Sequence, residues 1–159
     1  MIVVADSSPL CYLILIEQIH VLPALYGRVI VPPAVVTELN QERTPTVVRQ
    51  WLSASPEWLH VQAPQQGLAL LPDQLGVGER EAIALAAELS ADALLIDDRD
   101  GRREAEKRNL PVLGTLRVLA DAAEHGLLNL RVTFDCLRQT NFRADEQLMQ
   151  RLLAKLDGM

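Results

Sequence analysis

A stretch that alternates between helical and strand patterns, residues 78–115, constrains the fold of this chain most. Residues 79–89 are rich in alanine with a helical period, and residues 93–96 form a short apolar run typical of a buried strand. A charged helical pattern follows over residues 102–108, and residues 110–113 indicate another strand. Strands that are joined through helices pair in parallel, so the sequence predicts an α/β protein with a parallel sheet.

The same alternation extends over the rest of the chain. Residues 1–5 are an apolar run that we expect to form the first strand, and Ser8 and Pro9 suit the start of the next helix, with Ser8 as its N-cap. Residues 62–73 show no clear period, so we expect a loop there that could move near a site. Further strands are expected over residues 28–31 and 58–61, and a short strand or a plain connection over residues 127–132. Further helices are expected over residues 10–19, 21–26, 34–40, 44–53, 115–124, 134–140 and 144–156.

Aspartates follow two of the predicted strands. Asp6 comes directly after the first strand, and Asp97, Asp98 and Asp100 come where the strand over residues 93–96 ends. The carboxyl ends of parallel strands meet at one edge of the sheet, where open α/β proteins place their sites. We therefore expect Asp6 and Asp98 to lie at one edge, although Asp6 taken alone fits a capping residue at a helix N-terminus equally well.

Two glutamates lie where a predicted helix would face inward. Glu38 follows Ala34 and Val35 by about one turn, which could turn it toward an apolar face. At about 100° per residue, Glu79 falls on the apolar face of its helix, while Glu81 falls on the opposite, solvated face. An inward carboxylate is costly unless it is paired or bound to a metal. Glu38 taken alone is also compatible with an ordinary solvated glutamate.

Acids gathered at one site repel each other. Two unit charges about 4 Å apart cost about 4 kcal/mol at an effective dielectric constant of about 20. A cluster of acids survives when its members share protons or bind cations, and a ligand set made only of oxygens suits Mg²⁺ or Mn²⁺ rather than zinc. Such ions activate water for phosphodiester hydrolysis. The sequence offers no suitable Cys, His or Lys set for covalent catalysis.

Basic side chains follow the aspartates along the next predicted helix. Arg99 and Arg102 stand beside the acids, and the further cations alternate with Asp and Glu. A phosphate-binding flank is one interpretation, and a solvated helix with ion pairs between neighbouring turns is the other. We favour phosphate binding for Arg99 and Arg102 because of their acidic neighbours. The further cations are Arg103, Lys107 and Arg108.

Composition narrows the classes of function. The 159 residues fit one domain, and an apolar fraction of 49% is enough for a core. A net charge of −6 and a pI near 5.0 exclude a chain that is basic as a whole, so nucleic acid would be bound through a local patch and cations. Cys11 and Cys136 lie far apart and no signal peptide is evident, which suggests reduced thiols in a cytoplasmic protein. The apolar run over residues 9–16 is too short to span a bilayer.

Five segments resemble one known family. They are VADSSPL, VPPAVVTEL, GEREAIALA, ALLIDDRDGRREA and NLPVLGTLRVLADA, and in this order and spacing they are similar to PIN-domain proteins, in particular to the prokaryotic group related to VapC toxins of toxin–antitoxin pairs. The resemblance covers residues 2–128, and LRQTNFRADEQLMQRLL is similar to the tail of that group. It implies a three-layer α/β/α sandwich with a mostly parallel sheet as a catalytic domain over residues 1–128. A helical extension over residues 129–159 would pack on the same domain.

The resemblance also implies a ribonuclease site that depends on Mg²⁺ or Mn²⁺. The positions that match the family pattern are Asp6, the hydroxyl residue Ser7 after it, the helix glutamate Glu38, the third acid Glu79, the strand-end Asp98 and the trailing Asp100. The expected catalytic residues are Asp6, Glu38, Glu79 and Asp98. The expected metal ligands are Asp6, Glu79, Asp97 and Asp98. The expected supporting or substrate-binding residues are Ser7, Arg99, Asp100 and Arg102.

This sequence departs from the family pattern at three positions. Glu79 stands where an aspartate is usual, Ile96 stands where a threonine is usual, and Asp97 is an added acid. A register slip of one residue would exchange Asp97 and Asp98. The departures motivate a second hypothesis, a non-catalytic PIN-like module that binds nucleic acid or protein. A phosphoacceptor domain, suggested by LLIDD, is disfavoured because later strands offer no matching aspartate and lysine.

The expected partners follow from the same resemblance. They are an RNA substrate, an antitoxin protein that neutralises the ribonuclease, and a second copy of the chain in a homodimer. No association with a membrane is expected.

Overall fold

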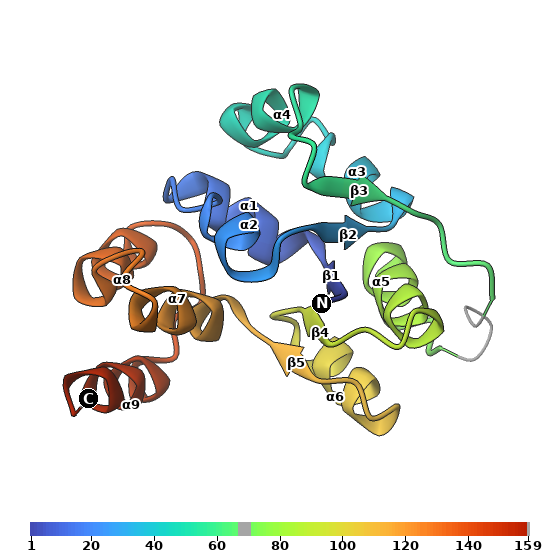
Figure 1. The fold of residues 1–159 in the computed structure, drawn as a ribbon. Helices are drawn as coiled ribbons and strands as arrows, with labels where there is room; N and C mark the ends of the chain where they lie inside the picture. Colours follow the sequence, from blue (N-terminus) through green and yellow to red (C-terminus); the bar gives the residue numbers. More distant parts are fainter. Residues whose placement is uncertain (67–70, 159) are drawn as a thin grey trace.

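The computed structural model describes residues 1–66 and 71–158, and in that part of the chain five parallel strands form one sheet (Figure 1). The strands lie in the order β3-β2-β1-β4-β5, so β1 is central. Val4 in β1 lies opposite Ile30 in β2 and Leu94 in β4. The strands are β1 (Val3–Ala5), β2 (Val29–Val31), β3 (Leu59–Val61), β4 (Ala93–Leu95) and β5 (Val112–Leu113).

Helices connect the successive strands, as parallel pairing requires. The chain passes through α1 and α2 between β1 and β2, through α3 and α4 before β3, through α5 before β4, and through α6 before β5. The helices are α1 (Ser7–Leu15), α2 (Val21–Tyr26), α3 (Pro33–Leu39), α4 (Thr46–Ser53), α5 (Val77–Glu88), α6 (Arg99–Lys107), α7 (Thr115–Glu124), α8 (Leu130–Arg138) and α9 (Glu146–Asp157).

Side chains of the strands alternate between two apolar layers, as the strand period of two residues requires. Val3 and Ala5 belong to the buried cluster that α1, α2 and α7 complete, whereas Val4 and Leu94 belong to the cluster on the other face, with α5. Figure 1 accordingly shows α1, α2 and α7–α9 on one side of the sheet and α5 and α6 on the other. The predicted three-layer α/β/α sandwich with a parallel sheet is confirmed.

The predicted and observed ends of elements differ where a cap decides them. Asp6 precedes α1 as its N-cap, so the prediction that Ser8 is the N-cap is wrong. Residues 127–132 contain no strand, because the Asn129 side chain accepts from the Val132 backbone N–H at 3.0 Å and starts α8 at Leu130. Of the predicted loop over residues 62–73, residues 67–70 lie outside the described residues.

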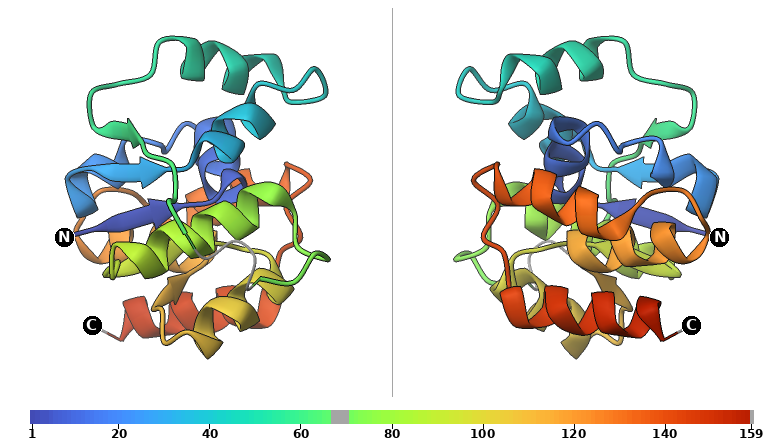
Figure 2. Two further views of the ribbon diagram at one scale, coloured as in Figure 1. Left: turned by 90° about the vertical axis from the view of Figure 1, so that its right-hand side faces the viewer. Right: turned by 90° about the vertical axis from the view of Figure 1, so that its left-hand side faces the viewer.

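The C-terminal helices pack on the same core as the sheet. α8 and α9 both contact α7, and Figure 2 shows α9 running along the bottom of the molecule in both views. Phe134, Leu137 and Met149 are fully buried and join the cluster that contains Val3 and Ala5. The domain boundary at residue 128 stays a prediction. No helix within residues 1–66 and 71–158 is long and apolar enough to cross a membrane.

Candidate active site

The candidate site lies at the carboxyl edge of the sheet, where the order of the strands reverses. From β1 the chain adds β2 and β3 on one side and then returns to add β4 and β5 on the other. Asp6 follows β1, and Asp97 and Asp98 follow β4, which places all three at the switch point where α/β sheets bind ligands. The Asp6 backbone N–H donates to the Leu95 carbonyl oxygen at 2.9 Å and fixes Asp6 against β4.

Asp6 holds a buried carboxylate with an unsatisfied oxygen. The residue is 3% exposed, and its Oδ1 has no hydrogen-bond partner in the described part of the chain. Burial raises the pKa of Asp6 to about 7. A hydrogen bond from the Ser7 backbone opposes the rise, and the negative charges of Glu38, Asp97 and Asp98 add to it. The site therefore concentrates more negative charge than its own donors neutralise.

Glu38 is held in place by donors from two other elements. The Ser7 hydroxyl, at the start of α1, donates to Oε2 at 2.7 Å, and the Gly78 backbone N–H, in the first turn of α5, donates to Oε1 at 3.0 Å. A Cβ atom at residue 78 would clash with the Glu38 carboxylate, so glycine permits this approach. The carboxylate of α3 is thus oriented by α1 and α5.

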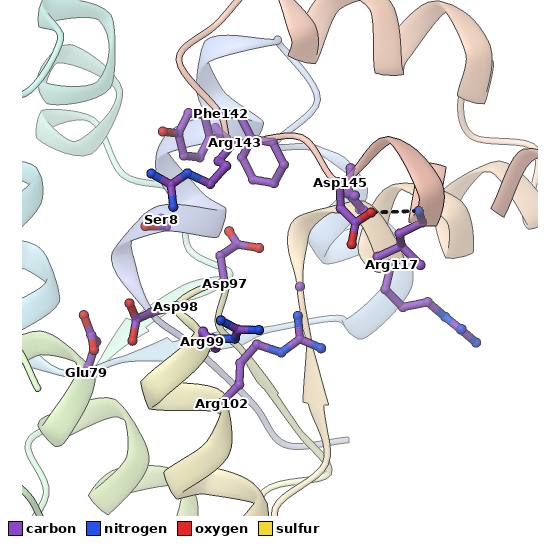
Figure 3. Close-up of a pocket in the computed structure, with 14 residues that line it drawn as sticks. Ser8, Glu79, Asp97, Asp98, Arg99, Arg102, Arg117, Phe142, Arg143 and Asp145 are labelled. Carbon is purple, nitrogen blue, oxygen red and sulfur yellow. Dashed lines mark hydrogen bonds between the residues drawn. The ribbon is translucent and has the colours of Figure 1, made fainter. Parts of the chain in front are cut away.

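Glu79 and Asp98 form a pair of neighbouring acids at one end of the site (Figure 3). Asp98 caps α6, because its Oδ2 accepts from the Gly101 backbone N–H at 2.8 Å. The pKa of Glu79 is raised to about 8 by burial, then by the charges of Asp6 and Asp98 and by a side-chain hydrogen bond with Asp98. The neighbouring carboxylates thus oppose ionisation of Glu79, as like charges at one site do.

Asp97 ties β4 to the start of α7. Its two oxygens accept from the Thr115 backbone N–H and the Thr115 hydroxyl, each at 2.7 Å. Burial raises the pKa of Asp97, while these hydrogen bonds and the positive charge of Arg102 oppose the rise. Each Asp97 oxygen therefore already has a partner within the chain, unlike Asp6 Oδ1. Metal binding by Asp97 stays a prediction.

A cavity of about 510 Å³ opens beside the carboxylates. Glu79, Asp97 and Asp98 line it together with Arg99 and Arg102 of α6, so three of the predicted acids and the two predicted phosphate-binding arginines share one space. Asp6 and Glu38 are not among its lining residues. Its other lining residues are Ser8, Tyr12, Gly114, Leu116, Arg117, Phe142, Arg143, Asp145 and Leu148. Figure 3 shows the side chains of Glu79 and Asp98 at one end and Arg117 at the other.

The remaining polar residues of α6 lie outside this cavity. Asp100 is exposed in the first turn of α6 and does not line it. Lys107 and Arg108 pair with Glu104 at 3.0 and 2.9 Å, so the alternative interpretation as ordinary ion pairs within a helix holds for them.

Comparison with known proteins now assigns the chain to a family. A family model described as a PIN domain (DUF3368) matches residues 2–158. The chain belongs to the PIN-domain family. The fold is also similar to that of a solved PilT N-terminus domain protein, SSO1118, from the archaeon Sulfolobus solfataricus P2, with a TM-score of 0.54 and 21% identity over 79% of this chain and 96% of that one. Among curated proteins no match is found.

PIN domains form a nuclease-type superfamily that typically uses divalent metal ions. In the described part of this PIN domain, no group of three or more acidic, His or Cys side chains is arranged closely enough to hold such an ion. The donor chemistry nevertheless fits one. Asp6 Oδ1 is buried without a partner, and Glu79 and Asp98 offer carboxylate oxygens beside it, which are the ligands that Mg²⁺ and Mn²⁺ prefer.

Sequence reasoning missed several residues of the PIN-domain site. Glu81, expected on the solvated face of its helix, is half-buried, and its Oε1 accepts from the Ala34 backbone N–H at 3.1 Å in the first turn of α3. Thr115 was missed as the partner of Asp97, although a Gly-Thr pair directly after a strand is a signal for a helix start. Phe142 and Arg143 gave no signal, because only the packing of the C-terminal helices brings them to the cavity.

Proposed function

We propose that this PIN-domain protein is an endoribonuclease that requires Mg²⁺ or Mn²⁺. The observation that carries the proposal is the unsatisfied Oδ1 of buried Asp6 among three further acids. An isolated buried charge is costly, so such an oxygen calls for a proton or a cation. The raised pKa values of Asp6 and Glu79, caused first by burial and then by the neighbouring carboxylates, support the same conclusion.

We assign each acid a role from the hydrogen bonds that its oxygens already accept within the described part of the chain. Asp6, Glu79 and Asp98 would hold the ion, because they have oxygens that no donor of the chain occupies fully. Glu38, held by Ser7 and Gly78, would orient water at the edge of the site. The bound ion supplies polarisation of water and of the phosphodiester.

Asp97 would act through position rather than by contact with substrate. It holds the start of α7 through Thr115 and lies beside Arg102. Arg99 and Arg102 would bind phosphate oxygens, for which the planar guanidinium is suited. Asp100, exposed on α6, would at most shape the outer rim.

The proposal extends to the biological context that the sequence resemblance suggests. RNA is the substrate, the protein is the toxin of a toxin–antitoxin pair, and it forms a homodimer. An antitoxin that inserts an arginine beside Glu79 and Asp98 would gain a charge-assisted hydrogen bond and relieve the repulsion between these acids. It would compete with the metal ion for the same carboxylates.

The test is cleavage of labelled tRNA and mRNA fragments by purified protein in Mn²⁺, in Mg²⁺ and in EDTA. Asp6→Asn combined with Asp98→Asn is the inactive variant, and Asp157→Asn, at an exposed carboxylate in the last turn of α9, is the matched control. Cleavage that requires metal, persists in the control and disappears in the double variant is expected. Folded protein that binds neither metal nor RNA and cleaves nothing would overturn the proposal in favour of a protein-binding PIN-like module.

A further inference from the structure

The cavity beside the carboxylates has a wall that hydrolysis itself does not need. This wall comes from the C-terminal extension, whose loop between α8 and α9, residues 139–145, contributes Phe142 and Arg143. Figure 3 shows both side chains on the opposite side of Asp97 from Arg99 and Arg102. The extension therefore shapes the space next to the acids as well as packing on α7.

Two aromatic rings give this wall a fixed shape. The rings of Tyr12 and Phe142 meet edge to face, with 4.9 Å between centroids and 82° between planes. The Tyr12 hydroxyl also donates to the Asn141 side-chain oxygen at 2.9 Å, which holds the loop against α1. Both rings are only partly buried and both line the cavity, so aromatic surface remains accessible there. Such surface stacks on nucleic-acid bases without regard to their hydrogen-bonding edges.

Cations line both sides of the same cavity. In the part of the chain that the structure describes, Arg99 and Arg143 make no side-chain hydrogen bond or ion pair, and Arg102 interacts through its charge with Asp97. Arg117, by contrast, pairs with Asp121 at 3.2 Å. A guanidinium group that forms no ion pair within the chain can donate two parallel hydrogen bonds to the oxygens of a phosphate.

From these features we infer that the cavity is a subsite for the nucleotide next to the scissile phosphate of single-stranded RNA. Phe142 stacks on its base, and Arg102 and Arg143 hold its phosphate from opposite sides. The volume of about 510 Å³ lies within the usual range of about 300–1,000 Å³ for small-ligand pockets. The inference rests on the proposed function, and it makes the C-terminal extension an element of substrate selection.

Binding without cleavage tests the subsite separately from catalysis. Fluorescence anisotropy in EDTA would measure the affinity for a labelled single-stranded RNA of about ten nucleotides, with 2-aminopurine at one position to report stacking. Phe142→Leu keeps the apolar volume and removes the ring, and Phe142→Tyr keeps the ring. Arg143→Gln removes one cation, and Arg28→Gln, at an exposed arginine before β2 and thus at the opposite edge of the sheet, is its matched control.

The expected result is about a tenfold loss of affinity for Phe142→Leu, with restored affinity in Phe142→Tyr. Arg143→Gln should reduce the slope of log affinity against log salt by about 0.7, the value for one phosphate contact, while Arg28→Gln should not change it. RNA cleavage by the wild type together with unchanged binding by Phe142→Leu and Arg143→Gln would overturn the subsite and leave the nuclease. Losses of binding in these variants without any cleavage would support the subsite and refute the nuclease, and absence of both binding and cleavage would refute both.

Discussion

Asp6→Asn should make the metal-free protein increasingly more stable relative to the wild type as the pH rises. The pKa of Asp6 is raised from 3.8 to about 7 in the folded chain. A raised carboxyl pKa means that the folded state binds a proton that the unfolded state releases, so stability is lost as the pH rises from the unfolded toward the folded pKa. At about 1.4 kcal/mol per tenfold change in proton affinity, the whole loss is about 4 kcal/mol. Asparagine does not titrate, so the variant does not lose this part of its free energy of unfolding as the pH rises.

The assay is urea unfolding in EDTA between about pH 4 and pH 8, followed by the fluorescence of Trp51 and Trp58. The free energy of unfolding of Asp6→Asn minus that of the wild type should increase by up to about 4 kcal/mol over this range. A constant offset from the new amide does not matter, because only the change with pH is interpreted. A difference that stays constant with pH would refute the reasoning, since Asp6 would then not be protonated on folding.

Metal should reverse the same loss in the wild type. At about pH 8, Mg²⁺ or Mn²⁺ at about 100 times its dissociation constant should add about 2.7 kcal/mol to the free energy of unfolding. Asp6→Asn replaces the carboxylate with a neutral amide, a much weaker metal ligand, and should gain much less. An equal gain in both proteins would show that the ion binds elsewhere in the chain.

Three further predictions concern the supports of the site and of the fold. Gly78→Ala should displace Glu38 and lower metal affinity at least tenfold in calorimetric titration, because the new Cβ would clash with the carboxylate. Thr115→Val should cost about 1–3 kcal/mol in urea unfolding, because it leaves Asp97 short of one donor. Phe134→Ala should cost about 3–5 kcal/mol and unfold the chain in one transition, because this ring is fully buried in the core that the sheet shares.

Matched variants distinguish these effects from general damage. Gly158→Ala, where the added Cβ meets only ordinary van der Waals contacts, should leave metal affinity unchanged. Thr37→Val, at an exposed hydroxyl that bonds only its own helix, should change stability little. If Phe134→Ala gave two separate transitions, the C-terminal helices would fold independently of the sheet, contrary to the prediction.

Strand and helix positions followed from the sequence because they depend on local patterns. Strands buried on both faces appear as short apolar runs, and the acids at their ends, Asp6, Asp97 and Asp98, could therefore be assigned to one edge. The inward direction of Glu79 followed from helical angle alone. The angle could not predict the hydrogen bond of Glu81, because the donor, the Ala34 backbone N–H, belongs to the start of another helix, α3.

Contacts between distant segments account for what the sequence did not show. Asp97 and Thr115 are 18 positions apart, and nothing in the local pattern says that the threonine satisfies this acid. The wall formed by Phe142 and Arg143 depends on how α8 and α9 return across α7 toward α1. Periodicity predicted the helix over residues 144–156, observed as α9, but it could not say which edge of the sheet the preceding loop would reach.

The hydrogen bonds of the site explain why Asp6, rather than Glu38 or Asp98, has a buried oxygen without a donor in the described part of the chain. Ser7 and Gly78 hold Glu38, the cap of α6 holds Asp98, and these are structural bonds that the fold forms anyway. Asp6 stands at the centre of the sheet, after β1, and within residues 1–66 and 71–158 no donor reaches its Oδ1. A proton or a cation satisfies this oxygen, so the two compete for it. Metal affinity must therefore rise with pH through the pKa of Asp6, near 7, and on to that of Glu79, near 8, because both proposed ligands lose their protons on binding the ion.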